Sequence, residues 1–358
     1  MTDTLWLAIP GVIIWSGILS LPWQPWRIRE KLEAATTENA GLSDVTVLIP
    51  ARNEAAVIAA TLQSVAAQGR NLRIILVDDQ SADATVAEAE RLNLENLTII
   101  DGRPLEHGWS GKLWALHQGL AFVSTDNVLL LDADIRLQPG TVSALKTRME
   151  EHDLHLVSLL AFLRMDSVWE KLLMPAFVFF FKLLYPFHLS NNGSKAVAAA
   201  AGGCILLRRS SLEQAGGFSG IRDSLIDDCA LARQFRDAGF STWTGLSHSA
   251  LSQRSYDGLT DIWNMVARTA YTQLRHSILL LLLCSSLMTA AFVLPVAGLF
   301  SAGAATSLLA GGALFLMVAS FMPTLRYYGI HPLWCAGLPL AGALYLLMTW
   351  TSAWRYWT

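Results

Sequence analysis

The segment V-L-L-L-D-A-D-I-R, Val128 to Arg136, decides the fold that this sequence predicts. Its four apolar residues are too few for a helix and are typical of a strand buried in a parallel sheet. Asp132 and Asp134 follow one residue apart, so a strand would direct both to the same side, at the edge where open α/β sheets bind ligands. Paired carboxylates there suit Mg²⁺ or Mn²⁺ carrying phosphates. An ordinary strand end before a turn at Pro139-Gly140 is an equally good interpretation of this pair alone.

Composition limits the class of protein. The 358 residues are 53% hydrophobic and only 15% charged, which is too apolar for a purely soluble enzyme of this size. The formal net charge of −3 argues against a nucleic-acid-binding surface, so we expect no nucleic-acid partner. The four cysteines are widely spaced and form no C-x-x-C pair, so neither a zinc site nor a disulfide framework is indicated.

The region from Asp44 to about Arg148 alternates short apolar runs with helical patterns. The predicted strands are Val45 to Pro50, Arg73 to Asp79, Leu97 to Ile100 and Val128 to Leu131. Strands joined by helices indicate an α/β domain with a mostly parallel sheet and right-handed crossovers. Further on, Gly202 to Arg209 predicts a strand opened by glycines, and Leu225 to Phe235 predicts a helix.

Acidic residues recur at the ends of three predicted elements. They are Asp78-Asp79, Asp132 with Asp134, and Asp227-Asp228. Together with Lys112, which follows a G-W-S-G turn, they predict a site for a diphosphate held by a metal. Lys112 at a helix start would face phosphate, although a solvated lysine is as good an interpretation. One carboxylate would accept the proton of an incoming hydroxyl.

Four apolar segments predict a membrane protein. Leu5 to Leu21 is uncharged, and basic residues follow from Arg27 onward. This order favours an uncleaved anchor with its N-terminus outside and the next residues in the cytosol; a hydrophobic helix docked on the domain is the alternative. Three longer segments predict spans that leave the C-terminus outside: Ile278 to Phe300, Ala302 to Met322 and Leu333 to Trp354.

The segment Trp169 to Phe187 is apolar and aromatic, but it contains Glu170 and Lys182, and we expect Pro175 and Pro186 to break it. This pattern favours helices that lie in the membrane interface, with a core helix as the alternative. We therefore expect three parts. They are an anchor at 1–26, a catalytic domain at 27–275 that includes interfacial helices at about 166–190, and a membrane domain at 276–358.

The order of motifs resembles the family 2 glycosyltransferases, which are inverting enzymes with a Rossmann-like GT-A fold. The matching segments are T-V-L-I-P-A-R-N-E (46–54), V-D-D-Q-S-A-D-A-T (77–85), G-W-S-G-K-L-W-A-L (108–116), L-L-D-A-D (130–134), G-G-C-I-L-L-R-R (202–209), G-G-F (216–218) and I-D-D-C-A-L-A-R (226–233). The resemblance covers about residues 44 to 275. It implies a GT-A catalytic domain.

The resemblance also implies roles for individual residues. The nucleotide sugar would contact Pro50, Arg52, Glu54, Asp78, Asp79, Lys112, Asp132, Arg254 and Arg268. Asp134 and Asp132 would hold a divalent metal, and Asp228 would be the general base. The acceptor side would include Gly202, Gly203, Cys204 and Asp227.

The sequence departs from the family pattern in two places. Asp227 stands where glutamate is usual, and W-N-M-V-A-R (263–268) replaces a Q-x-x-R-W motif. Either Arg268 or Arg254 would then supply the charge that faces phosphate.

The membrane pattern resembles the hopene-associated (hopanoid) glycosyltransferases of bacteria, which are akin to ceramide glucosyltransferases. This resemblance implies a UDP-sugar donor, a hopanoid-like lipid acceptor and a multi-pass protein of the bacterial inner membrane with a cytosolic catalytic domain. Two alternatives stay open. One is transfer to a polyprenyl phosphate, and the other is a non-catalytic membrane protein that binds nucleotide sugar or lipid.

Overall fold

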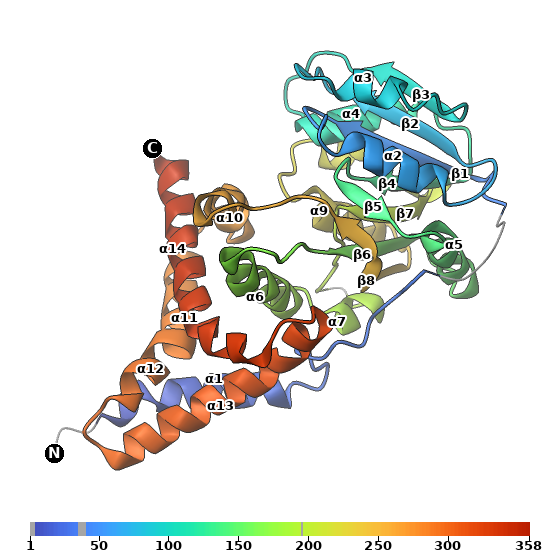
Figure 1. Ribbon diagram of the computed structural model, residues 1–358. Helices are drawn as coiled ribbons and strands as arrows, with labels where there is room; N and C mark the ends of the chain where they lie inside the picture. Colours follow the sequence, from blue (N-terminus) through green and yellow to red (C-terminus); the bar gives the residue numbers. More distant parts are fainter. Residues whose placement is uncertain (1–3, 35–40, 195) are drawn as a thin grey trace. The chain divides into compact units, whose positions relative to one another are not determined.

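The computed structural model describes residues 4–34, 41–194 and 196–358 (Figure 1). Residues 1–3 of the predicted anchor lie outside the described part. The chain forms two compact units. Unit 1 comprises Met1–Arg29, Met165–Leu184 and Ser255–Thr358, and unit 2 comprises Glu30–Arg164 and Tyr185–Arg254. In this division residues 165–184 and 255–275 group with the C-terminal helices, and the boundaries expected from the sequence stay a prediction.

Unit 2 is built on an eight-stranded sheet with the order β3-β2-β1-β4-β7-β6-β8-β5. The strands are β1 Val45–Ala51, β2 Arg73–Asp78, β3 Leu97–Asp101, β4 Asn127–Leu131, β5 Ile135–Leu137, β6 Leu156–Phe162, β7 Cys204–Arg208 and β8 Thr242–Ser252. β1 is parallel to β2 and β4, and β2 is parallel to β3, as the alternation predicts. β7 runs antiparallel to both β4 and β6, so the sheet as a whole is mixed.

Helices cover both faces of this sheet (Figure 1). Along β1, Val47 and Ile49 belong to one hydrophobic core and Leu48 to the other, because successive strand side chains point to opposite faces. The first core is closed by α2 Ile58–Ala66, α3 Thr85–Glu90 and α5 Thr141–Glu151. The second is closed by α4 Gly111–Leu120, α8 Arg209–Gln214, η2 Phe218–Ile221 and α9 Asp227–Asp237. The short α7 Phe187–Asn191 contacts β8.

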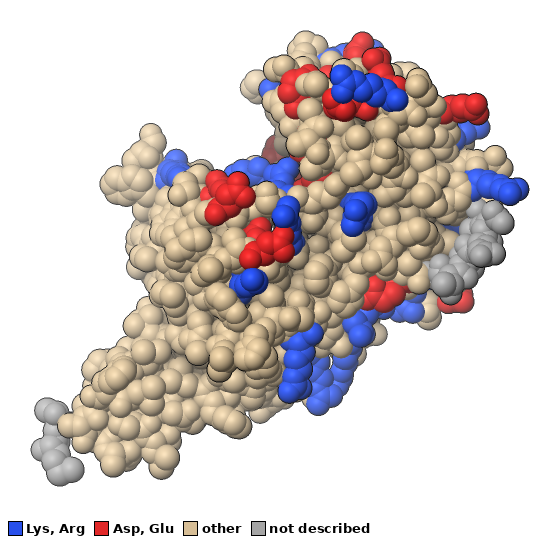
Figure 2. All heavy atoms as spheres, in the orientation of Figure 1, with Lys and Arg blue, Asp and Glu red and all other residues tan. Residues whose placement is uncertain are grey.

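Unit 1 is helical. Its elements are η1 Leu5–Leu7, α1 Ile9–Ser20, α6 Val168–Leu184, α10 Leu259–Gln273, α11 Ile278–Met288, the π-helix η3 Thr289–Val293, α12 Leu294–Leu299, α13 Ala304–Tyr327, η4 Pro332–Gly337 and α14 Leu338–Trp357. Within the described residues, three helices are long and apolar enough to cross a membrane: Ile278–Leu299, Ala304–Tyr327 and Pro332–Trp357. These helices match the three predicted spans. In Figure 2 the lower left of the view, where α12 and the start of α13 lie, shows no Lys, Arg, Asp or Glu, and Arg326 stands in the last turn of α13.

The predicted N-terminal anchor is an apolar helical segment, Leu5–Ser20, which is shorter than the three spans. At about 1.5 Å per residue it extends about 24 Å, against a hydrocarbon core of about 30 Å. It packs inside unit 1, where Trp15 is buried and donates a hydrogen bond from Nε1 to the carbonyl oxygen of Ala291 at 3.0 Å. A fourth membrane crossing therefore stays a prediction.

The expectation that prolines break the segment at 169–187 is wrong in part, because α6 runs through Pro175 and ends before Pro186. Glu170 and Lys182 are each only 2% exposed. The Glu170 carboxylate accepts hydrogen bonds from three backbone N–H groups, those of Asp166, Ser167 and Tyr256. Lys182 donates from Nζ to the carbonyl oxygen of Arg27. These buried charges fasten α6 to its neighbours within unit 1, and an interfacial position for α6 stays a prediction.

Candidate active site

Backbone hydrogen bonds from both sides hold the two carboxylates that follow β4. The N–H of Asp132 donates to the carbonyl oxygen of Gly203 at 3.1 Å, which fixes Asp132 to the start of β7. The carbonyl oxygen of Asp134 accepts from the N–H of Gln253 at 2.8 Å, which fixes Asp134 to the end of β8. The carboxylate pair therefore sits at the sheet edge that the sequence predicts, between two strands that come from distant parts of the chain.

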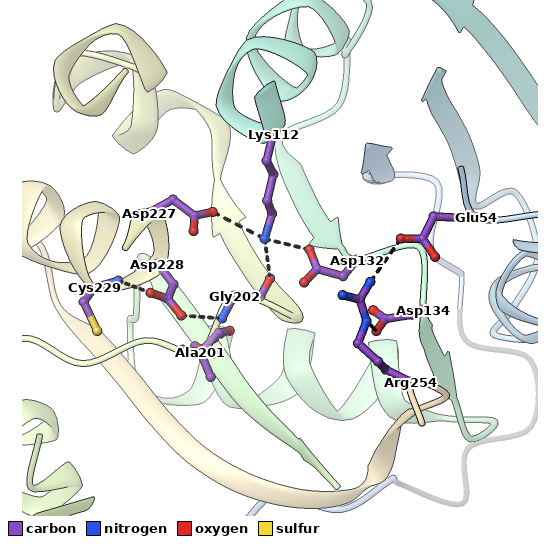
Figure 3. A network of polar contacts seen from close by, with 11 residues as sticks. Glu54, Lys112, Asp132, Asp134, Ala201, Gly202, Asp227, Asp228, Cys229 and Arg254 are labelled. Carbon is purple, nitrogen blue, oxygen red and sulfur yellow. Dashed lines mark hydrogen bonds and ion pairs between the residues drawn. The ribbon is translucent and has the colours of Figure 1, made fainter. Parts of the chain in front are cut away.

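Lys112, the second residue of α4, links this edge to the start of α9 (Figure 3). Its Nζ lies 2.7 Å from Oδ1 of Asp132 and 3.3 Å from Oδ2 of Asp227, and it donates to the carbonyl oxygen of Gly202 at 3.5 Å. Burial alone would lower the pKa of Lys112, but the carboxylates of Asp132 and Asp227 raise it. One ammonium group therefore holds two carboxylates that are 95 positions apart in the sequence.

Asp228 lies in the first turn of α9 beside this lysine. Its Oδ2 accepts from the N–H of Gly202 at 2.8 Å, and its Oδ1 accepts from the N–H of Cys229 at 2.7 Å. Burial, followed by the negative charge of Asp227, raises the pKa of Asp228 to about 6. A carboxylate fixed in this way is ionised at neutral pH and accepts a proton more readily than an ordinary aspartate, as a general base requires.

The two glycines before β7 allow this close approach. A Cβ on Gly202 would lie 3.2 Å from Nζ of Lys112 and 3.4 Å from Oδ2 of Asp228. A Cβ on Gly203 would lie 3.2 Å from the side chain of Ile135. The next residue, Cys204, has no exposed surface and packs in the hydrophobic core, and its place on the acceptor side stays a prediction.

Arg254 forms the second cationic bridge of the site (Figure 3). Its Nε donates to Oδ2 of Asp134 at 3.1 Å, and its Nη2 donates to Oε1 of Glu54 at 3.1 Å. Burial raises the pKa of Glu54, and the charge of Arg254 opposes this shift. Each of the two carboxylates after β4 is thus paired with a different basic side chain.

The remaining predicted donor residues lie at the ends of β1 and β2. Pro50 pairs with Val77 in the parallel register, which brings the two strand ends together. Asp79 lies 3.5 Å from Arg52 between Oδ2 and Nη1, and burial raises the Asp79 pKa. Oδ2 of Asp78 accepts from the N–H of Ser81, whereas its buried Oδ1 has no hydrogen-bond partner among the described residues. An oxygen in this position suits an N–H donor of a ligand.

A small pocket lies beside Lys112, Asp227 and Asp228. It is lined by Lys112, Leu113, Leu116, Leu130, Gly202, Ile205, Phe218, Asp227, Asp228 and Leu231. The polar side chains enter from α4 and α9, and the apolar ones come from the core beneath. Arg268 belongs to unit 1, on α10, and its contact with phosphate stays a prediction.

Sequence reasoning missed the groups that position Glu54. The N–H of Glu54 donates to Oγ1 of Thr85 at 2.8 Å, and the N–H of Ala55 donates to Oδ2 of Asp83 at 3.1 Å. In the sequence, Asp83 and Thr85 read only as residues that begin a helix. Their second role depends on the parallel pairing of β1 and β2, which brings the two following loops together.

The carboxylates of this site suit a metal ion that is also coordinated by a substrate, and not one whose ligands all come from the protein. Among the described residues, no three His, Cys, Asp or Glu side chains form a group that could hold a metal ion. A magnesium or manganese ion on a diphosphate needs only one or two protein carboxylates, because phosphate oxygens and water complete its shell. Asp132 and Asp134, one residue apart and partly buried after β4, meet that requirement.

Part of the chain is similar to known glycosyltransferases. Residues 46–216 match the family model described as glycosyl transferase family 2. Two curated relatives are 4,4'-diaponeurosporenoate glycosyltransferases. The one from Staphylococcus aureus is 31% identical over 33% of this chain and 31% of its own length, and the one from Staphylococcus haemolyticus is 30% identical over 30% and 27%. The chain thus aligns with less than a third of the length of these relatives.

One solved structure resembles nearly the whole chain. It is a mannosyltransferase from Pyrobaculum calidifontis in complex with GDP-Man and Mn²⁺, with a TM-score of 0.59, 18% identity, and coverage of 95% of this chain and 99% of that one. At this identity the likeness shows the fold, which is a mixed-sheet, Rossmann-like GT-A domain accompanied by apolar helices.

Proposed function

We propose that this chain, whose residues 46–216 match the glycosyl transferase family 2 model, transfers a sugar from a nucleotide diphosphate donor to the hydroxyl of a membrane lipid, with inversion. One observation carries the proposal above all others. A single ammonium group, that of Lys112, contacts Asp132 at the ligand edge of the sheet and Asp227 next to Asp228. A group that would meet the donor and a group that would deprotonate the acceptor thus belong to one connected network.

The donor would bind at the ends of β1, β2 and β4. The buried, unpartnered Oδ1 of Asp78 would accept an N–H from the nucleoside, and Asp79 lies beside it. Asp132 and Asp134 would face the diphosphate. A divalent cation held by these two carboxylates and the diphosphate would neutralise the charge that builds up on the leaving group. The mannosyltransferase of the same fold was solved with Mn²⁺, which supports this choice of metal class.

The acceptor hydroxyl would be activated by Asp228. The oxygen of the acceptor hydroxyl attacks the anomeric carbon as the bond from that carbon to the diphosphate oxygen breaks. The proton of the hydroxyl passes to the Asp228 carboxylate. A single displacement of this kind inverts the anomeric configuration. Lys112, positively charged beside the same pocket, would stabilise the negative charge of the departing diphosphate.

A lipid acceptor agrees with the composition of unit 1. Its three candidate spans would anchor the chain in a membrane, which we take to be the bacterial inner membrane with unit 2 in the cytosol. The curated relatives are named as glycosyltransferases of 4,4'-diaponeurosporenoate. A polycyclic, hopanoid-like alcohol is the acceptor that the motif resemblance favours.

Two alternatives predict different results. A polyprenyl phosphate is already anionic, so its transfer would need no general base. A non-catalytic protein would bind nucleotide sugar without consuming it. Only the first of the three functions needs the raised proton affinity of Asp228.

The proposal can be tested with the full chain in lipid nanodiscs. Radiolabelled UDP-glucose and GDP-mannose are supplied separately with MnCl₂, together with a hydroxylated hopanoid or a polyprenyl phosphate. We expect label in the organic extract with the hydroxyl acceptor, and none after EDTA. Labelling of the polyprenyl phosphate alone would favour the first alternative. Absence of both transfer and donor hydrolysis would favour a non-catalytic protein.

A further inference from the structure

Arg254 occupies an unexpected position for a residue of a metal–diphosphate site. It follows the end of β8 by two residues, and its guanidinium group lies between the carboxylates of Asp134 and Glu54 (Figure 3). The side chains of Asp134 and Glu54 are only 13% and 23% exposed, whereas that of Arg254 is 51% exposed. The cation is therefore the accessible member of the trio, and the two carboxylates lie behind it.

The contact with Asp134 conflicts with metal binding. Oδ2 of Asp134 accepts a hydrogen bond from Arg254, and the guanidinium group stays charged at any physiological pH. A divalent cation that approaches this carboxylate would share it with a positive charge a few ångströms away. Such a repulsion is strong in a partly buried site. Asp134 can serve as a full metal ligand only when Arg254 moves.

A nucleotide diphosphate would offer the Arg254 guanidinium group an alternative partner to the two carboxylates. Guanidinium groups form two-pronged hydrogen bonds with phosphate as readily as with carboxylate. Because half of the Arg254 side chain is exposed, it can turn towards a diphosphate without disturbing the core. The neighbouring backbone stays fixed, since the N–H of Gln253 donates to the carbonyl oxygen of Asp134.

We propose that Arg254, held by Asp134 and Glu54, competes with the divalent cation for Asp134, so that the free protein binds metal weakly and the arriving diphosphate releases the carboxylate to the metal. The part assigned to the diphosphate rests on the proposed function. Binding of metal and of donor is then coupled, and the coupling is reciprocal. Lys112 has no part in this competition, because it contacts Asp132 and not Asp134.

Metal binding without nucleotide tests the competition directly. The detergent-solubilised full chain is titrated with MnCl₂, and the free Mn²⁺ is followed by its electron paramagnetic resonance signal. Arg254→Met should bind one Mn²⁺ per chain about tenfold or more tightly than the unmodified protein. Arg136→Met is the matched control, because Arg136 is exposed, lies two residues after Asp134 and carries the same charge. It should leave Mn²⁺ affinity nearly unchanged.

Two further variants secure the interpretation. Arg254→Met combined with Asp134→Asn should lose the gained affinity, which identifies Asp134 as the ligand. Arg254→Lys keeps a positive charge but cannot bridge both carboxylates. Its Mn²⁺ affinity should therefore lie between those of the unmodified protein and Arg254→Met. Arg254→Met should also gain more thermal stability from Mn²⁺ than the unmodified protein, because a ligand that binds only the folded state stabilises it.

Equal Mn²⁺ affinity in Arg254→Met and the unmodified protein would overturn the proposal, as would a gain that survives the loss of Asp134. These outcomes are independent of the proposed function. If the protein transfers sugar but Arg254→Met does not change Mn²⁺ affinity, the proposed function stands and the proposed competition is wrong. If Arg254→Met binds Mn²⁺ more tightly but no donor supports transfer, the competition stands and the proposed function is wrong.

Discussion

Oδ2 of Asp228 accepts a hydrogen bond of 2.8 Å from the backbone N–H of Gly202. This contact fixes the proposed base to the segment before β7, and Lys112 contacts the same glycine through its carbonyl oxygen. Position 202 therefore controls the spacing between the base and the lysine. The φ angle of Gly202 is not positive, so its backbone conformation is open to any residue. Glycine is needed at this position for its small size.

Replacing Gly202 with alanine should lower kcat about tenfold, because the new Cβ would lie 3.2 Å from Nζ of Lys112 and displace it or Asp228 by a few tenths of an ångström. The measurement is steady-state transfer with saturating donor. Gly41→Ala is the control, as its Cβ would meet no atom of the described residues within 4 Å. Equal kcat in both variants would show that the contact at Gly202 has no catalytic consequence.

Activity should depend on the ionisation of Asp228. Its pKa, raised to about 6 by burial and by Asp227, means that the carboxylate becomes protonated as the pH falls below 6. A protonated carboxyl cannot accept the hydroxyl proton, so kcat should fall about tenfold per pH unit on that side. A pH–rate profile from 4.5 to 8 tests this, and a flat profile down to pH 5 would contradict it.

Lys112→Met should move this acidic limb to higher pH. The positive charge of Lys112 lowers the pKa of Asp228, so its loss lets burial and Asp227 raise that pKa further. Donor affinity should fall as well, because Asp132 loses its partner. Lys146→Met, which breaks an ion pair with Asp44 elsewhere in unit 2, serves as the control with an unchanged profile. An acidic limb at the same pH in Lys112→Met and the unmodified protein would show that Lys112 does not affect the ionisation of the base.

The sequence was sufficient to predict the elements that consist of uninterrupted apolar runs. β1, β2 and β4 match their predicted segments closely, and each of the three candidate spans falls where more than 20 consecutive residues carry no charge. Their signals are local, because burial on both faces or in lipid requires nearly every residue to be apolar. The carboxyl edge of the sheet, with Asp132 and Asp134, could be located for the same reason.

Features that depend on distant pairing were not predictable. β8 is rich in Ser, Thr and Gly and forms because β6 and β5 pair with it on either side. The bridge from Arg254 to Glu54 spans 200 positions, so the sequence left Arg254 and Arg268 as equal candidates. The burial of the Cys204 side chain in the core follows from strand alternation in β7, which the motif around it does not reveal.

Packing in unit 1 gives a prediction about stability. A Cβ on Gly342 of α14 would lie 2.4 Å from the ring of Phe292. Gly342→Ala should therefore destabilise the protein by about 1–3 kcal/mol through overpacking. Thermal unfolding in detergent measures this change. Gly312→Ala on α13 should have no such effect, because its Cβ would meet nothing within 4 Å. Similar unfolding temperatures for the two variants would contradict this arrangement of helices.

The role of Asp228 is the central claim, and a single-turnover experiment with Asp228→Asn tests it most directly. Labelled donor is bound to the protein with MnCl₂, lipid alcohol is added, and the label transferred is followed with time. We predict donor binding close to that of the unmodified protein and transfer slowed about 100-fold or more, as expected for loss of a general base. Asp237→Asn, at the exposed far end of α9, should transfer at the normal rate. Normal transfer by Asp228→Asn to a hydroxyl acceptor would contradict the account.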